Sequence, residues 1–318
     1  MIPVDLITGF LGAGKTTFLL RYARALMARG LRLGVLVYDH GAVNVDLPLL
    51  GELRGEQCEL ETLAGGCGPD CHRRRFRTRL IAMAMSGYDR VIIEPSGVFD
   101  MDEFFDTLSE PPLDKWYEVG SVLAIVDAQL SPPASPEEEF LLASQTACAG
   151  RVLLSRTQLV PPAQTGAAIA AMRRAQNAIH AAQTPDTALV AKDWALLTPE
   201  DFSALMNSGF HLPDYVKTVA GAGTDFQSLS FLDLPLSGEE LREKVETLLH
   251  DASCGRVLRV KGFFAEGGEW FQLNATAQDY LVRPTPPTRA ALTVIGATLN
   301  EDVITLLLTG RAVEHRLL

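Results

Sequence analysis

One stretch near the start of the chain has the residue types and spacing of a phosphate-binding loop. Residues 9–16 read Gly-Phe-Leu-Gly-Ala-Gly-Lys-Thr and satisfy the pattern G-x-x-x-x-G-K-[ST]. Glycines let the backbone fold back so that several N–H groups point at one anion, at the positive end of the following helix. In this pattern Lys15 reaches the β- and γ-phosphates and the Thr16 hydroxyl ligates Mg²⁺. We therefore predict a nucleoside-triphosphate site formed by Gly12, Ala13, Gly14, Lys15, Thr16 and Thr17. The alternative is a glycine-rich turn that binds no ligand.

A second group of residues has the chemistry of a transition-metal site. Cys67, Cys71 and His72 lie within six residues, and thiolate and imidazole suit Zn²⁺ and its neighbours Co²⁺ and Ni²⁺. A loop that turns into a helix at Asp70 would bring both thiols to one ion. Two or three ligands make an open site, which is suited to metal transfer or is completed by a second subunit in a homodimer. Unliganded thiols at a helix start are the alternative. Cys58 is a conceivable further ligand, but a buried free thiol is the favoured interpretation.

The elements that must position these residues follow from the pattern of apolar residues. Residues 4–8 form a short apolar run before the loop, and a helical pattern begins at Thr16 with apolar residues spaced by three and four. Further short apolar runs occur at 33–38, 91–93, 122–126, 152–154 and 189–190. Strands that alternate with helices predict an α/β fold, with a mainly parallel sheet and helices on both faces.

The pattern changes beyond residue 221. A strand is predicted at 226–234, a helix at 238–250, strands at 257–264 and 270–274 flanking a turn, a strand at 292–295 and a helix from Asn300. This order suits a small α+β domain with an antiparallel sheet. We predict two domains, a nucleotide-binding domain over residues 1–221 and an α+β domain over 222–318.

Four strings in the chain resemble those of the CobW-type GTPases, relatives of the HypB and UreG nickel-insertion GTPases. Residues 9–17 (G-F-L-G-A-G-K-T-T) resemble that family's phosphate loop, and 38–46 resemble its N-E-F-G-x-x-x-x-D segment. Residues 93–97 (I-E-P-S-G) resemble E-[ST]-[ST]-G, and 257–262 resemble the R-x-K-G strand of its C-terminal domain. The cysteine cluster departs from the family's C-x-C-C. The resemblance spans nearly the whole chain and implies a P-loop NTPase fold and nucleotide-gated handling of a transition metal.

Further site residues follow from this resemblance. Asp39 and Asp46 are placed to face Mg²⁺ or its waters, together with Thr16, although a helix cap or a solvated acid is the alternative for either. Glu94 ends a buried run and would orient the metal shell or the attacking water, while the Gly97 N–H would approach the γ-phosphate. The predicted catalytic set is Lys15, Thr16, Asp39, Asp46 and Glu94.

The nucleobase site differs from the guanine-selective pattern N-K-x-D. The matching residues are Ser155, Arg156, Thr157 and Gln158. Arg156 could stack on a base, but the neutral Gln158 cannot form a charge-assisted pair with guanine. The resemblance implies GTP and GDP as the nucleotides and leaves base selectivity open. We also expect slow hydrolysis, since no arginine finger or water-positioning glutamine can be assigned.

Composition excludes several classes of protein. The 318 residues carry a formal net charge of −11, which disfavours nucleic acid and anionic lipid as partners. No segment approaches about 18 consecutive apolar residues, so no membrane span is expected. The five cysteines are too few and too scattered for a disulfide framework, and the N-terminus does not resemble a signal peptide. These features predict a cytoplasmic protein.

The leading hypothesis is a GTP-dependent metallochaperone or metal-insertion factor that delivers Zn²⁺ or a similar ion to a client metalloprotein. A P-loop kinase or ATPase that acts on a small molecule, with structural cysteines, is the first alternative. A nucleotide-dependent regulatory binding module is the second. Metal binding that depends on Cys67 and Cys71 separates the first hypothesis from the kinase, and phosphate release separates it from the binding module.

Overall fold

The structure is a computed structural model and describes residues 1–39, 47–64, 69–130, 135–215, 226–277 and 279–311. These residues fall into two compact units, the first within residues 1–39 and 49–215 and the second within residues 47–48 and 226–311. The domain boundary predicted between residues 221 and 222 lies outside the described residues.

The first unit is built on a seven-stranded sheet in the order β3-β2-β4-β1-β5-β6-β7, and all of its strand pairs are parallel. The strands are β1 (Ile2–Thr8), β2 (Leu33–Asp39), β3 (Cys58–Ala64), β4 (Arg90–Glu94), β5 (Tyr117–Asp127), β6 (Arg151–Ser155) and β7 (Leu189–Val190). The predicted parallel sheet is confirmed. The carboxyl ends of its strands meet at one edge, where open α/β sheets bind their ligands.

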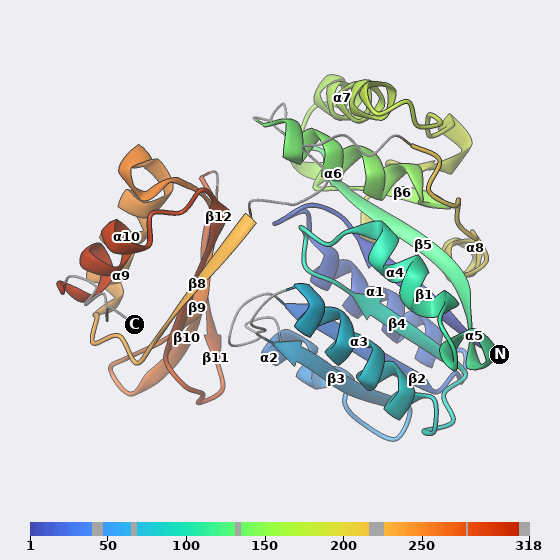
Figure 1. The fold of residues 1–318 in the computed structure, drawn as a ribbon, viewed down its shortest axis with the longest axis horizontal. Coiled ribbons are helices and arrows are strands. Elements are labelled where there is room, and N and C mark those ends of the chain that lie inside the picture. Colours follow the sequence, from blue (N-terminus) through green and yellow to red (C-terminus); the bar gives the residue numbers. More distant parts are fainter. Residues whose placement is uncertain (40–46, 65–68, 131–134, 216–225, 278, 312–318) are drawn as a thin grey trace. The chain divides into compact units, whose positions relative to one another are not determined.

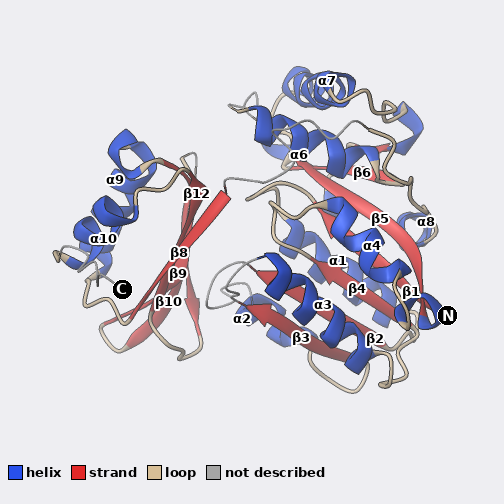
Figure 2. Cartoon of the chain, viewed as in Figure 1, coloured by secondary structure: helices blue, strands red, loops and turns tan. Residues whose placement is uncertain are grey.

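The helices of this unit lie on both faces of the sheet, as predicted (Figures 1 and 2). They are α1 (Lys15–Met27), α2 (Leu47–Leu50), α3 (Pro69–Met83), α4 (Met101–Ser109), α5 (Leu113–Trp116), α6 (Pro136–Ala147), α7 (Pro162–Ala178) and α8 (Pro199–Met206). None of the helices that the structure describes has the length and apolar character that a bilayer-crossing segment needs.

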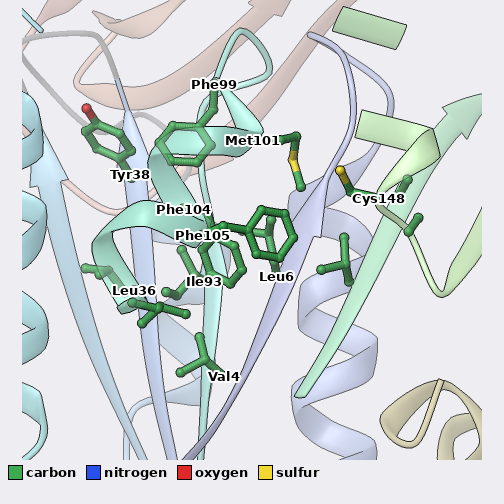
Figure 3. Packing of buried hydrophobic residues seen from close by; sticks show 14 of the residues in the cluster. Val4, Leu6, Leu36, Tyr38, Ile93, Phe99, Met101, Phe104, Phe105 and Cys148 are labelled. Carbon is green, nitrogen blue, oxygen red and sulfur yellow. The ribbon is translucent and has the colours of Figure 1, made fainter. Parts of the chain in front are cut away.

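Alternate residues of the central strands decide which helix covers which face. Val4 and Leu6 of β1 belong to the same buried cluster as Phe104 of α4 (Figure 3). Phe76 of α3 is a further member of this cluster. Asp5 points to the other face, where its carboxylate accepts a hydrogen bond from the Tyr22 hydroxyl of α1. This period of two is the geometry of a strand buried on both sides.

The second unit is an antiparallel sheet in the order β11-β10-β9-β12-β8 with two helices. Its elements are β8 (Phe226–Leu232), α9 (Gly238–His250), β9 (Arg256–Glu266), β10 (Glu269–Ala275), β11 (Tyr280–Thr285), β12 (Ala291–Ala297) and α10 (Glu301–Thr309). The predicted hairpin turn contains Gly267 and Gly268, whose φ angles of 61° and 87° favour glycine. The predicted α+β architecture is confirmed.

Candidate functional site

The phosphate loop wraps around the side chain of its own lysine. Gly9, Gly12 and Gly14 have φ angles of 140°, 77° and 101°, a region that residues with a side chain rarely adopt. The Lys15 ammonium donates to the carbonyl oxygens of Gly9 at 3.0 Å and Phe10 at 3.3 Å. Only 6% of Lys15 is exposed, so a buried positive charge lies beside the backbone that would hold the phosphates.

Helix α1 begins at the loop and carries Thr16 and Thr17 in its first turn. The Thr16 hydroxyl donates to Glu94 Oε1 at 2.6 Å, so the end of β4 and the start of α1 bring two hard oxygen atoms together. Hydroxyl and carboxylate oxygens are the donors that Mg²⁺ prefers. The pair predicted to hold Mg²⁺ and orient its shell therefore suits that ion, whereas Thr17 is exposed.

Gly97 lies directly against the phosphate loop. A side-chain carbon built on Gly97 would overlap the backbone of Phe10 and Leu11, so a glycine is required for this approach. Gln145 of α6, which is 1% exposed, donates from Nε2 to the Gly97 carbonyl at 3.1 Å. We did not predict a role for Gln145 from the sequence. Polar residues are common in this helix, so its sequence does not single out Gln145.

The residues predicted for the nucleobase end lie where β6 ends. Arg156 has a φ of 55°, and its guanidinium forms an ion pair with Asp127 at the end of β5 and donates to the Gly12 carbonyl at 3.1 Å. Arg156 therefore ties the phosphate loop to the sheet edge. Gln158 follows in an exposed 3₁₀ turn, Thr157–Leu159.

Trp194 also lies at this end, and the sequence did not predict it. It begins the 3₁₀ turn Trp194–Leu196 (η4), and its ring packs edge-on against Phe18 of α1 with centroids 5.2 Å apart. A contact between residues so far apart in the chain has no local sequence signal.

Most of the predicted metal ligands have no described side chain. Asp46 and Cys67 belong to the segments that the structure does not describe, and only the backbone positions of Asp39, Cys71 and His72 are given. Asp39 ends β2, while Cys71 and His72 lie in the first turns of α3. In the described part of the chain, no group of three or more metal-ligating side chains is arranged around one point. The metal ligand set stays a prediction.

Cys58 is buried at the opposite end of β3 from the cysteine cluster, as expected of a free thiol. Burial, followed by the nearby Glu59 charge, raises the pKa of the Cys58 thiol to about 11. Cysteine binds a metal as the thiolate, so the raised pKa makes Cys58 unfavourable as a metal ligand.

A parallel sheet, a glycine loop leading into a helix at its edge and a carboxylate beside the loop threonine together define a P-loop nucleoside-triphosphatase fold. Residues 3–183 match the family described as "CobW/HypB/UreG, nucleotide-binding domain", and the chain belongs to that family.

The chain is also similar to individual proteins and to a solved structure. The zinc chaperone YjiA of Escherichia coli is 28% identical over 285 residues, which cover 84% of this chain and 83% of YjiA. The zinc chaperone YeiR of the same organism is 28% identical over 163 residues, 51% of this chain and 48% of YeiR. The crystal structure of Zn(II)-bound YjiA GTPase covers 97% of this chain and 98% of its own, at 22% identity and a TM-score of 0.37.

Proposed function

We propose that the protein is a GTP-dependent metallochaperone or metal-insertion factor for Zn²⁺ or a similar transition metal. The observation that carries the proposal is the phosphate loop, in which Lys15 is buried against Gly9 and Phe10 beside the contact between Thr16 and Glu94. Membership of the CobW/HypB/UreG family and the similarity to two zinc chaperones support the metal-handling part.

Mg²⁺ fits the oxygen atoms at the loop, and Thr16 and Glu94 would hold it, directly or through its waters. The ion neutralises charge on the phosphate oxygens when the nucleotide is bound. Lys15 binds the same phosphates, and Gly97 brings a backbone N–H to the γ-phosphate end of the loop. Asp39 and Asp46 are proposed as further acids facing the ion or its waters.

Slow hydrolysis is part of the proposal. Fast P-loop GTPases use an arginine that contacts the transferring phosphoryl group and a glutamine that positions water. Here Arg156 pairs with Asp127 and the Gly12 carbonyl, and Gln145 donates to the Gly97 carbonyl. Both side chains are engaged in holding the loops of the site, which suits a switch better than a rapid hydrolase.

The segment that carries the proposed metal ligands follows β3, whose carboxyl end lies at the same sheet edge as the phosphate loop. Its candidate ligands are Cys67, Cys71 and His72, between the carboxyl end of β3 at Ala64 and the first turns of α3. The acidic segment 39–46 follows the carboxyl end of β2, which pairs with β3. We propose that binding of the γ-phosphate changes the conformation of residues 39–46 and of the cysteine segment. This change would alter the affinity of the site for the metal.

A metal titration with the full chain tests this proposal. Zn²⁺ affinity is measured against a chromophoric chelator with a non-hydrolysable GTP analogue or with GDP bound. We expect sub-micromolar affinity that differs between the two states and is lost in the double variant Cys67→Ser, Cys71→Ser.

The control is Cys254→Ala, which changes a buried thiol of the second unit and leaves the proposed ligands intact. Equal Zn²⁺ affinity in the two nucleotide states would reject the switch. Zn²⁺ binding that survives the double cysteine change would reject the ligand set, and the kinase or ATPase alternative would then be preferred.

A further inference from the structure

Trp194 lies at the edge of the sheet where a nucleotide bound to the loop would place its nucleoside. Strand β7 pairs with β6 in parallel, with Val190 opposite Leu153, so both strands end at the same sheet edge. Ser155 is the last residue of β6, and η4 begins shortly after β7. The chain therefore brings Ser155 and Trp194 to the edge where the phosphate loop begins.

The indole of Trp194 reaches the phosphate loop itself. A side-chain carbon built on Gly14 would lie 3.4 Å from Cη2 of Trp194 and 3.7 Å from Cβ of Ser155. Both residues thus border the glycine that precedes Lys15. Ser155 stands at a position where the N-K-x-D pattern has the longer asparagine.

Several contacts fix the turn that carries Trp194. Its ring packs edge-on against Phe18, and its carbonyl accepts a hydrogen bond from Arg21 at 3.4 Å. Asp193 accepts from the Ala195 N–H at 2.9 Å, which closes the turn. The tryptophan is thus held by α1, the helix that starts at the phosphate loop.

Two polar atoms at this point have no hydrogen-bond partner among the described residues. They are the buried Oγ of Ser155, a residue only 3% exposed, and the buried indole Nε1 of Trp194. Buried polar groups in folded proteins nearly always have a partner. The indole N–H needs an acceptor and the serine hydroxyl takes either a donor or an acceptor. A purine nucleoside carries both kinds of atom.

We propose that Ser155 and Trp194 form a nucleobase site that binds purines by aromatic contact and does not select guanine strongly. The inference rests on the proposed nucleotide binding and specifies the substrate class, which is purine nucleoside triphosphates. Contact with an aromatic face tolerates different bases because every base has a π-face. Strong discrimination requires a buried group that only the correct base satisfies, and Gln158 supplies no carboxylate for guanine.

Titrations with three ligands show whether Trp194 contacts the nucleobase or only stabilises the phosphate loop. GTP, ATP and inorganic tripolyphosphate, each with Mg²⁺, are titrated by calorimetry into the wild type, Trp194→Ala and Trp194→Phe. Loss of one base–aromatic contact should weaken both nucleotides about 5- to 150-fold in Trp194→Ala. Tripolyphosphate affinity should change less than about twofold, since it has no base, and Trp194→Phe should retain most nucleotide affinity.

Selectivity provides the second test. The wild type should bind GTP and ATP within about tenfold of each other, and Gln158→Asp should favour GTP by about tenfold or more through a charge-assisted pair. A wild-type preference for GTP above 100-fold would overturn the inference, as would an equal loss of tripolyphosphate binding in Trp194→Ala. Either result leaves the proposed function intact, whereas a wild type that binds none of the three ligands rejects the nucleotide site itself.

Discussion

The middle and the carboxyl end of strand β1 differ in whether their buried polar groups have hydrogen-bond partners. Asp5, which is completely buried, accepts hydrogen bonds from Arg90 at 2.7 and 2.8 Å, from the Tyr22 hydroxyl at 2.7 Å and from the Ser121 N–H at 2.8 Å. The Ser121 N–H lies where the pairing of β1 with β5 shifts register, so the carboxylate compensates an irregularity of the sheet. Every donor of this network points at one acceptor group.

The carboxyl end of the same strand leaves polar atoms without such compensation. Thr8 is completely buried, and its Oγ1 has no partner among the described residues; the same holds for Ser155 Oγ at the end of β6. A satisfied network stabilises the fold, whereas unsatisfied groups cost stability and are expected where a ligand supplies the partner. The comparison predicts that substitutions near Asp5 change stability and that substitutions at the loop change binding.

The largest effect is expected from Asp5→Ala. Removal of the carboxylate leaves the Arg90 guanidinium in a largely buried position without its counter-ion, which should lower the free energy of unfolding by about 3–5 kcal/mol. The measurement is urea denaturation, and Asp106→Ala, which removes an exposed carboxylate, is the matched control.

Nucleotide affinity of the folded Asp5→Ala variant should equal that of the wild type. A variant as stable as the wild type would show that the network contributes little. A large loss of affinity without loss of stability would show that the two parts of β1 are not separate in function.

Lys15→Ala should weaken nucleotide binding and leave stability nearly unchanged, the converse of Asp5→Ala. The ammonium forms charge-assisted hydrogen bonds with the phosphates, each worth about 1.5–3 kcal/mol, so nucleotide affinity should fall about 100-fold or more. The free energy of unfolding without nucleotide should change by less than about 1 kcal/mol, since the hydrogen bonds that Lys15 donates to the carbonyl oxygens of Gly9 and Phe10 join it to its own loop.

Calorimetry with GTP and urea denaturation without nucleotide measure the two quantities for Lys15→Ala. The matched control is Lys115→Ala, an exposed lysine in α5 away from the loop. Unchanged GTP affinity in Lys15→Ala would remove the basis of the nucleotide site.

The parts of this comparison differ in how far the sequence could predict them. The phosphate loop, the parallel sheet and the C-terminal hairpin follow from local patterns, because glycine positions and apolar runs are read within a few residues. The role of Asp5 could not be predicted, since Arg90 is 85 positions away in the chain. Trp194 and Gln145 were missed for the same reason.

Strand β3 was missed for a different reason. Its sequence, Cys-Glu-Leu-Glu-Thr-Leu-Ala, interrupts the apolar run with Glu59 and Glu61. Both side chains find partners on neighbouring elements, Glu59 with Tyr88 and Glu61 with Arg79 at 2.8 Å. The strand lies at the edge of the sheet, where one face can be polar, so the expectation of a continuous apolar run did not apply.

Glu103 in α4 represents a third case, in which a buried carboxyl group is stabilised by binding a proton. Its Oε1 is buried without a partner among the described residues. Burial and then the charge of Asp100 raise the pKa of Glu103 from its ordinary value of 4.5 to about 7, against the opposing effect of Arg73. The folded protein therefore holds this proton more tightly than the unfolded chain does.

The sign of the pH dependence follows from this proton. The contribution of Glu103 to stability is fully present below about pH 4.5 and is lost as the pH rises through about 7. Between pH 5 and pH 8 the wild type should therefore lose about 1–2 kcal/mol more than Glu103→Gln, after allowance for solvent screening of the partly exposed side chain. Urea denaturation of both proteins at the two pH values measures the difference, and Glu118→Gln, which changes an exposed glutamate, is the control.

Identical pH dependence in the wild type and Glu103→Gln would mean that Glu103 is ionised throughout this pH range. The unpartnered oxygen in α4 would then belong with Thr8 and Ser155, as an atom whose partner is supplied from outside the chain.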